Sequence, residues 1–251
     1  MNSLSSLMYM AYFDFAVKYR KTMIGPVWVL MGPTLFILTL GLLFGEVSNA
    51  QAEVFIPHLA IGLIVWTLVS GFVSGSTTVF QRHRAQILQG GMTLIDIVVV
   101  DVLKIGLLFM HQVLIVVAVM IYFQIEWSVY SWVSLFGLLI LVVNGVWLTL
   151  FFGMIGSRYR DLTEVVAAVM RIAFLATPII WLPEERSSDG VVGLFLSFNP
   201  FFHFLDIVRA PLLGDTISAV SWTVVVALSL CGALITVAFY RRLRYRVPLW
   251  V

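Results

Sequence analysis

Charged residues are scarce in this chain of 251 residues, since Asp, Glu, Lys and Arg make up 11% of it and hydrophobic residues 61%. Soluble domains carry about a quarter charged residues, and one soluble core could not enclose so much apolar surface. Cysteine is also nearly absent: Cys231 is the only one, which excludes an intramolecular disulfide framework. The composition therefore predicts a protein whose apolar side chains face lipid.

Several motifs of enzyme chemistry are missing as well. A nucleotide-binding loop needs G-x-x-x-x-G-K-[ST], but none of the lysines (Lys18, Lys21 and Lys104) follows a glycine. The sequences H-E-x-x-H and G-x-S-x-G do not occur. We therefore expect no catalytic residue, no metal and no cofactor bound by this chain. One enzyme alternative stays open, in which His203 and Asp206 act as a base and its orienting carboxylate in a membrane-embedded transferase on lipid-linked sugars.

Long apolar runs are what the sequence has in abundance. A helix that crosses a bilayer needs about 20 apolar residues, and we expect six runs to cross, at Pro26–Phe44, Pro57–Phe80, Ile97–Phe123, Trp132–Gly156, Leu162–Leu182 and Ala219–Tyr240. This pattern predicts an all-α integral membrane protein with a single permease domain over residues 1–251. Its parts would be a cytoplasmic interfacial helix in 1–25, a six-span bundle in 26–240 and a basic cytoplasmic tail in 241–251.

Two further segments are apolar without being simple spans. Residues 4–23 place apolar side chains at helical spacing, which predicts an amphipathic helix lying in the membrane interface. The segment Pro183–Ser218 holds two apolar stretches, Val191–Phe198 and Pro200–Leu213, separated by an Asn-Pro turn. These stretches predict two short re-entrant helices before the last span.

The basic residues fall almost entirely on one side of this six-span arrangement. Lys and Arg are enriched in cytoplasmic loops, so both termini should be cytoplasmic in a multi-pass protein. The residues on that side are Lys18, Arg20, Lys21, Arg82, Arg84, Arg158, Arg160, Arg241, Arg242, Arg244 and Arg246. The opposite loops carry Arg186 and Arg209 with Glu46, Glu53, Glu126, Glu184, Glu185, Asp189, Asp206 and Asp215.

A few charged residues lie inside the predicted spans. Arg171 is near the middle of the fifth, where an arginine costs about 2.5–3.5 kcal/mol on insertion scales. Its charge could meet helix carbonyls, Asn144 or Asp101, or it could line a hydrated substrate pathway. Asp101 and Lys104 are three residues apart, and we expect them to neutralise each other.

Polar and aromatic side chains in the spans suggest where a solute could pass. Serine and threonine at 70, 74, 76, 77 and 78 give the second span a polar face, which serves either interhelical hydrogen bonds or a polar lining. Aromatic rings could stack on sugar rings. The candidate pathway residues are Arg171, Phe174, Trp181, Trp66, Phe72 and Ser74.

Glycine spacing predicts where spans pack closely. Gly41-x-x-x-Gly45 and Gly71-x-x-x-Gly75 are small-xxx-small patterns, which allow two helix backbones to approach.

Five stretches of sequence occur in an order that resembles a known family. They are DFAVKYRKTMIGPVWVLMGP at 14–33, RYRDL at 158–162, TPIIW at 177–181, NPFFHFLDIVRAPLLG at 199–214 and RRLRYRVPLWV at 241–251. Together they resemble ABC transporter permeases that export cell-surface polysaccharides, and the basic ending is most similar to the O-antigen (lipopolysaccharide) export branch. The family usually has prolines around a short coupling helix between its second and third spans. Residues 81–96 have Arg82, Arg84 and two glycines there but no proline.

The resemblance implies a homodimeric channel in the bacterial inner membrane, driven by two copies of a separate ATPase that holds ATP and Mg. The substrate would be a lipid-linked polysaccharide, and no nucleic acid is expected as a partner. Exporters of capsule, teichoic acid or a small drug remain alternatives.

Two groups of charged and polar residues are candidates for the steps around that channel. Basic residues clustered around the short cytoplasmic loops are expected to dock the ATPase: Lys18, Arg20, Arg82, Arg84, Arg158 and Arg160. On the opposite side, a cation at headgroup depth can pair with a pyrophosphate. The residues expected to control lateral exit of the lipid-linked head group are Asn199, His203 and Arg209.

Overall fold

The computed structural model describes residues 3–20, 22–47, 52–183 and 191–251, and every regular element in these ranges is a helix. The elements are α1 (Leu4–Arg20), η1 (Gly25–Val27), α2 (Trp28–Val47), α3 (Ala52–Val73), η2 (Gly75–Thr78), α4 (Val79–Arg82), α5 (Arg84–Leu88), α6 (Leu94–Tyr122), η3 (Val129–Trp132), α7 (Val133–Arg158), α8 (Leu162–Ala176), α9 (Val191–Phe198), α10 (Pro200–Leu213), α11 (Ala219–Leu243) and α12 (Val247–Trp250).

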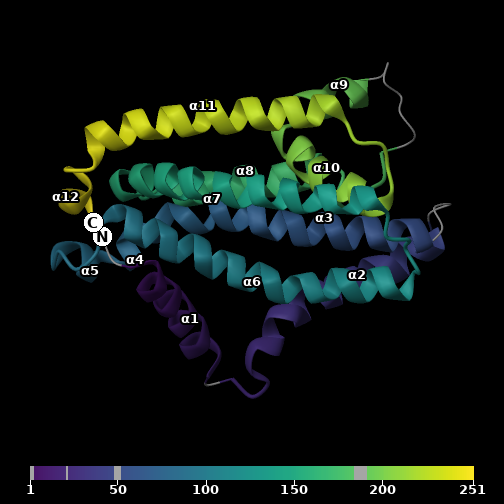
Figure 1. Ribbon diagram of the computed structural model, residues 1–251, viewed down its shortest axis with the longest axis horizontal. Helices are drawn as coiled ribbons and strands as arrows, with labels where there is room; N and C mark the ends of the chain where they lie inside the picture. Colours follow the sequence, from purple (N-terminus) through teal and green to yellow (C-terminus); the bar gives the residue numbers. More distant parts are fainter. Residues whose placement is uncertain (1–2, 21, 48–51, 184–190) are drawn as a thin grey trace.

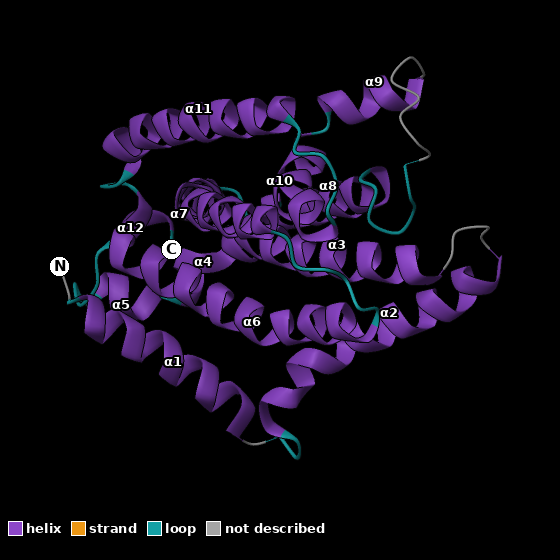
Figure 2. Ribbon diagram, turned by 45° about the vertical axis from the view of Figure 1, so that its right-hand side comes forward, coloured by secondary structure: helices purple, strands orange, loops and turns teal. Residues whose placement is uncertain are grey.

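The helix α3 lies inside the bundle and contacts α2, α6, α7 and α10, while α11 packs on α7 and α10 (Figures 1 and 2). One end of the bundle, which we call the α5 end, carries α5, α12 and both chain termini (Figure 1). The α9 end lies opposite and carries α9 and the turn from α6 to α7. The placement of the two termini at one end agrees with an even number of crossings.

Five helical segments are long and apolar enough to cross a membrane: Gly25–Leu43, Ala52–Arg82, Leu94–Tyr122, Val129–Arg158 and Ala219–Leu243. They correspond to the first four and the last of the predicted spans. The predicted fifth span contains α8, which has 15 residues and is shorter than the roughly 20 that a crossing needs. Its helix ends where Pro178 follows Thr177, because proline disfavours the α conformation in the residue before it.

The second crossing segment is a helix that changes its winding. It passes from α3 through the 3₁₀ turn η2 into α4, and the glycines of α7 let this turn come close. A Cβ atom at Gly156 would overlap the carbonyl oxygen of Thr77, and one at Gly153 would lie 2.6 Å from Val79. Both glycines lie outside the predicted small-xxx-small patterns, where a Cβ atom at Gly41 or Gly71 would come no closer than 3.0 Å to a neighbour.

Hydrogen bonds between hydroxyl groups join the same elements. The Ser76 hydroxyl donates to Thr149 over 3.0 Å, and the Thr163 hydroxyl donates to Thr77 over 3.1 Å. For Ser76 and Thr77, the interhelical interpretation of the polar face is thus confirmed.

Two ion pairs tie helices together near the α5 end. The Lys104 ammonium donates to Asp14 over 3.0 Å, which fastens α1 onto α6, and Arg82 donates to Asp101 over 3.1 Å. Asp101 and Lys104, which we expected to neutralise each other, form their ion pairs with other side chains. The fold brings α4 to one of these side chains and α1 to the other, so each charge has its partner on a different element.

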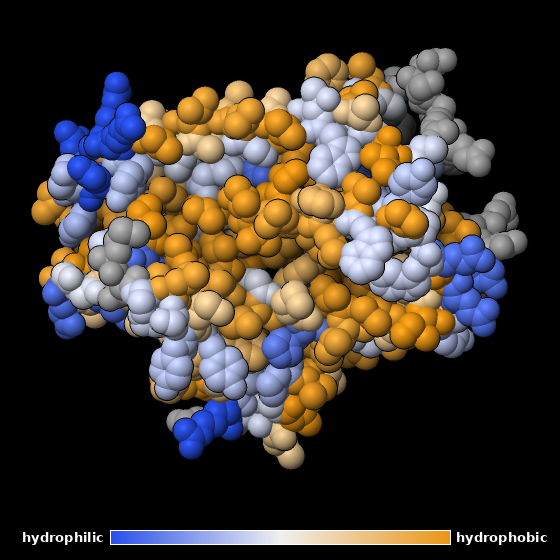
Figure 3. All heavy atoms as spheres, in the orientation of Figure 1, coloured by the Kyte–Doolittle hydropathy of each residue, from blue (hydrophilic) through white to orange (hydrophobic). Residues whose placement is uncertain are grey.

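The outer surface fits a bilayer. Figure 3 shows hydrophilic residues at both ends of this face and at the C-terminal end of α1, with a hydrophobic band between them. Exposed apolar side chains such as Leu114, Leu139 and Leu234 lie on three of the crossing helices. Lipid can cover such side chains without the cost they would carry in water.

Candidate functional site

An open groove of about 620 Å³ lies between α3 and α8. It is lined by Trp66, Ser70, Ser74, Ala167, Met170, Arg171, Phe174 and Leu175. Four of the six predicted pathway residues, Trp66, Ser74, Arg171 and Phe174, are therefore brought together on its walls. Serine hydroxyls, a guanidinium and aromatic rings in one groove can contact a solute that has both polar and apolar faces.

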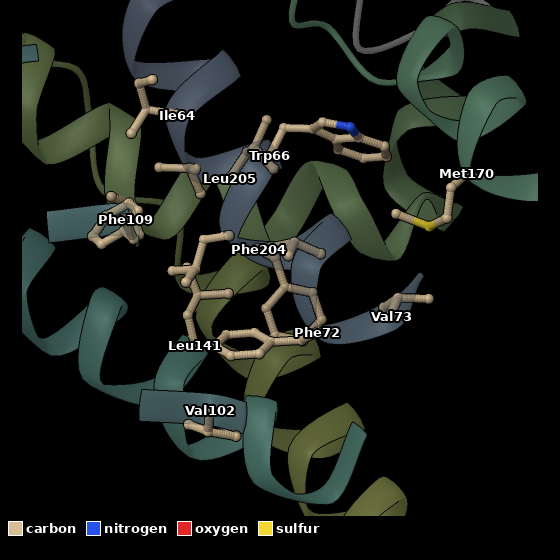
Figure 4. Close-up of a cluster of buried hydrophobic side chains, with 14 of the residues drawn as sticks. Ile64, Trp66, Phe72, Val73, Val102, Phe109, Leu141, Met170, Phe204 and Leu205 are labelled. Carbon is tan, nitrogen blue, oxygen red and sulfur yellow. The ribbon is translucent and has the colours of Figure 1, made fainter. Parts of the chain in front are cut away.

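Aromatic rings form one wall of this groove. The ring centroids of Trp66 and Phe174 lie 5.6 Å apart, and Phe174 is 6.3 Å from Phe36 of α2. On its other side, Trp66 meets Phe201 of α10 at 5.3 Å. Figure 4 shows the Trp66 indole directed toward the side of the cluster on which Met170 lies. Edge-to-face and tilted arrangements of this kind are the favoured geometry of aromatic pairs, and they join four helices at the groove.

Arg171 is the charged residue in the lining of this groove. It is exposed, and within the described part of the chain it makes no hydrogen bond or ion pair. The partners that the sequence offered are occupied elsewhere: Asn144 accepts from Trp147 and donates to Ser229, and Asp101 pairs with Arg82. Neither Asn144 nor Asp101 is therefore the structural partner of Arg171.

Two predicted pathway residues lie outside the groove lining. Phe72 is 1% exposed, and its ring lies against Gly145 of α7, where a Cβ atom would come within 2.6 Å. Figure 4 shows the ring beside Leu141. Phe72 is thus a packing residue, because α7 covers it. Trp181 is partly exposed, and its indole donates to the carbonyl of Leu175 over 3.1 Å at the end of α8.

The chain leaving α8 is fastened to α10 by what we call the α8–α10 latch: Thr177, Pro178, Asn199 and Arg209. Arg209 is 5% exposed and donates to the Pro178 carbonyl over 2.6 Å. The Asn199 amide donates to the Thr177 hydroxyl over 3.0 Å, while its oxygen caps α10 by accepting from Phe201 at 3.0 Å. A side-chain oxygen at this position stabilises a helix start, so one asparagine serves both elements.

Two of the predicted exit residues, Arg209 and Asn199, belong to this latch. Arg209 lies inside the protein beside His58 of α3, whose Nε2 is 3.1 Å from the guanidinium. Asn199 is also buried. In this arrangement their polar groups hold protein segments together.

His203 is enclosed in a similar way. It is 2% exposed, its Nε2 lies 2.9 Å from the Ser197 carbonyl and its Nδ1 lies 3.0 Å from the Ser221 hydroxyl. Asp206 accepts from Ser221 over 2.6 Å and is linked to the histidine only through that serine. Both ring nitrogens of His203 thus have partners within the chain, so neither is free to accept a proton from a substrate. Among the described residues, no three His, Cys, Asp or Glu side chains gather in a way that could hold a metal.

The predicted docking residues separate into two groups. Arg82, Arg84, Arg158 and Arg160 lie on or beside α4, α5 and the end of α7, at the α5 end. Within this group, Arg158 lies against the Trp250 ring of α12 at 5.7 Å, and Arg82 is paired with Asp101. Lys18 and Arg20 are in the last turn of α1, which points away from α5 in both ribbon views (Figures 1 and 2).

A helical bundle with five segments able to cross a membrane and a groove open between two of its helices fits a membrane transport protein. Comparison with known proteins agrees: residues 5–213 match the family described as ABC-2 type transporter. The chain belongs to this family, and it is therefore the membrane part of a transporter rather than a catalytic enzyme.

Individual relatives extend the similarity. The chain is 22% identical over 244 residues to O-antigen export system permease protein RfbA of Klebsiella pneumoniae, which covers 93% of this chain and 90% of that protein. It is 25% identical over 208 residues to the RfbA permease of Myxococcus xanthus, which covers 78% of this chain and 76% of the relative.

Proposed function

We propose that this chain is the transmembrane subunit of an ATP-driven exporter that moves lipid-linked O-antigen polysaccharide across the bacterial inner membrane. The observation that carries the proposal is the match along 93% of the chain to a permease named for O-antigen export. Two copies of the chain form the channel, and two copies of a separate ATPase bind ATP and Mg and hydrolyse the nucleotide.

In this proposal the chain crosses the membrane six times, with both termini in the cytoplasm. The short helix α8 crosses together with the segment that follows it, up to Leu182. The helices α9 and α10 re-enter from the outer side without crossing, as their lengths of 8 and 14 residues suggest. The basic residues at the α5 end then face the cytoplasm, in keeping with the enrichment of Lys and Arg there.

The groove between α3 and α8 is the part of the pathway that this subunit contributes. Trp66 and Phe174 offer ring faces on which sugars stack, and Ser70 and Ser74 offer hydroxyl groups. Arg171 supplies a planar set of donors for sugar hydroxyls or a pyrophosphate. Because the groove is open along one side, a second copy of the chain can close it into a channel.

A deletion strain tests the proposal. Deleting the gene should remove the long-chain surface polysaccharide and leave the lipid-linked precursor inside the cell, and the wild-type gene should restore export. In parallel, the permease purified in mild detergent should retain an ATPase chain. Unchanged O-antigen together with loss of capsule or teichoic acid would redirect the proposal to those exporters. A permease that retains no ATPase, in a strain with an unchanged surface, would overturn it.

A further inference from the structure

A second pocket, of about 150 Å³, lies apart from the groove, between α3, α6, the η3–α7 junction and α10. Its walls are hydrocarbon almost throughout, and none of the described lining residues is charged. Ile64 and Phe109, both labelled at the left of Figure 4, belong to these walls. The other lining residues are Ile61, Val65, Val113, Val116, Val117, Met120, Trp127, Ser131, Trp132, Ser134, Leu135, Leu138, Val208 and Leu212.

The pocket offers few hydrogen-bond partners for a water molecule. A buried water needs two to four polar partners, and the hydroxyl groups in the lining belong to two serines. The Ser134 hydroxyl donates to the Val208 carbonyl over 2.7 Å, and the Ser131 hydroxyl accepts from the Ser128 amide over 3.2 Å. If the pocket were empty, the side chains that line it would lose favourable van der Waals contacts. The chemistry of the walls therefore favours an apolar occupant over water.

The mouth of the pocket lies at the α9 end, where α6 turns into α7. Its rim residues Trp127 and Trp132 are 63% and 67% exposed, whereas Ile64 and Met120 at the back are 1% exposed. Trp127 lies between the crossing segments that end at Tyr122 and begin at Val129. Tryptophan at such a boundary marks the depth of the lipid headgroups, so the pocket opens where acyl chains begin.

We propose that this pocket binds part of one acyl chain of a membrane phospholipid, whose headgroup stays beside the two rim tryptophans. An engineered apolar cavity of about 150 Å³ takes up benzene, so the pocket has room for about six hydrocarbon carbons. Binding fills the space between α3, α6, α7 and α10 and holds these helices together at the α9 end. The site depends on the chain being in a membrane but not on the identity of the exported substrate.

The test uses the full-length protein in lipid nanodiscs that contain a trace of phosphatidylethanolamine with a photoreactive diazirine near the end of one acyl chain. After irradiation, mass spectrometry should find adducts on pocket residues of α6 and α7. The variant Val113→Phe places a ring in the pocket and should abolish these adducts. The control Leu114→Phe makes a similar change on the next residue of α6, which is 57% exposed, and should leave them unchanged.

Each other outcome counts against the proposal. Equal pocket labelling in the two variants, or adducts confined to the outer helix faces, means that no chain enters. Labelling only by a matching polyprenyl-phosphate probe means that the occupant is not a phospholipid. If Val113→Phe does not fold, Val113→Leu serves instead. Added phospholipid should then raise its melting temperature less than that of the wild type, and an equal rise contradicts the proposal.

Discussion

Two arginines of this protein have similar sequence surroundings but opposite environments. Each is set among apolar residues, in RIAF at 171–174 and in IVRAP at 207–211. Arg209 is enclosed and donates to the Pro178 carbonyl, whereas Arg171 is exposed on the groove. A buried guanidinium that has lost its water must find acceptors in the protein, while an exposed one is free to meet a solute. Substitution of the two should therefore affect different properties.

For the buried arginine we expect a loss of stability. Arg209→Met keeps much of the side-chain volume but removes the guanidinium from the Pro178 carbonyl, which keeps only His58 Nε2, at 3.0 Å, as a side-chain partner among the described residues. Losing a hydrogen bond to a charged group costs about 2 kcal/mol, so thermal melting of the purified permease should shift down by several degrees. Arg171→Met, the same change at an exposed site, is the control. Equal melting of the two variants would contradict the role of the latch.

For the exposed arginine we expect a loss of export at unchanged stability. Arg171→Ala should fold and retain the ATPase but lower surface polysaccharide several-fold, with Arg171→Lys between it and the wild type because lysine keeps the charge without the planar donors. Purified yield, melting temperature and surface polysaccharide should be measured on the same strains. A destabilised Arg171→Ala protein, or a stable one with full export, would remove this residue from the pathway.

The walls of the groove could be predicted in part because their residue types are unusual in a membrane helix. Arg171 stands out against apolar neighbours and Ser74 belongs to a cluster of hydroxyl residues in a span, and both line the groove. Phe72 could not be told apart from Trp66 in this way, because each is an aromatic residue in the same span. The difference arises from α7, whose Gly145 admits the Phe72 ring. Such a contact between residues far apart in the chain leaves no mark in local sequence.

At the scale of elements, α7 and the turn η2 depend on each other. Gly156→Ala adds a Cβ atom that overlaps backbone at Thr77, and backbone cannot turn aside as a flexible side chain does. Overpacking of this kind costs about 1–3 kcal/mol or more, so we expect low yield of folded permease. Gly106→Ala in α6, where a Cβ atom meets nothing within 4 Å, should give wild-type yield on size-exclusion chromatography. Similar yields of the two variants would contradict the close packing.

The long spans were predictable because hydropathy alone identifies them, and five crossing segments correspond to predicted runs. The helices α9 and α10 also have the predicted bounds, since Asn199 and Pro200 mark the helix start between them. The switch to 3₁₀ winding at η2 was not predicted. This turn lies against α7, where Thr77 comes close to Gly156.

At the scale of the whole molecule, the shared end of the two termini leads to a topology prediction. A reporter fused after Tyr245 should be cytoplasmic, and one fused after Glu126, in the turn between α6 and α7, should be on the opposite side. Alkaline phosphatase, active outside, and green fluorescent protein, fluorescent inside, give complementary signals for each position. The same side for both fusions would rule out the six-span arrangement.

The distribution of basic residues also indicates where an ATPase can dock. Phe15 of α1 contacts His111 of α6, with ring centroids 4.8 Å apart. His111 lies roughly 25 Å along α6 from Leu94, at 1.5 Å per residue. The last turn of α1, with Lys18 and Arg20, is therefore displaced from the α5 end. Of the remaining candidates, Arg82 neutralises Asp101 and Arg158 lies against Trp250, which leaves Arg84 and Arg160 exposed without an ion pair among the described residues.

We therefore expect the double variant Arg84→Glu and Arg160→Glu to release the ATPase while the permease stays folded. Neither side chain supports the fold through an ion pair, so reversing their charge should act on the partner alone. The matched control is Lys18→Glu with Arg20→Glu, an equal change of charge on α1, which should retain the ATPase. Reversal of Arg82 is unsuitable because it would leave the buried Asp101 beside another anion. Co-purification from detergent and melting of the permease measure the two effects separately. If the first variant keeps its ATPase, or the control loses it, the α5 end is not the docking surface.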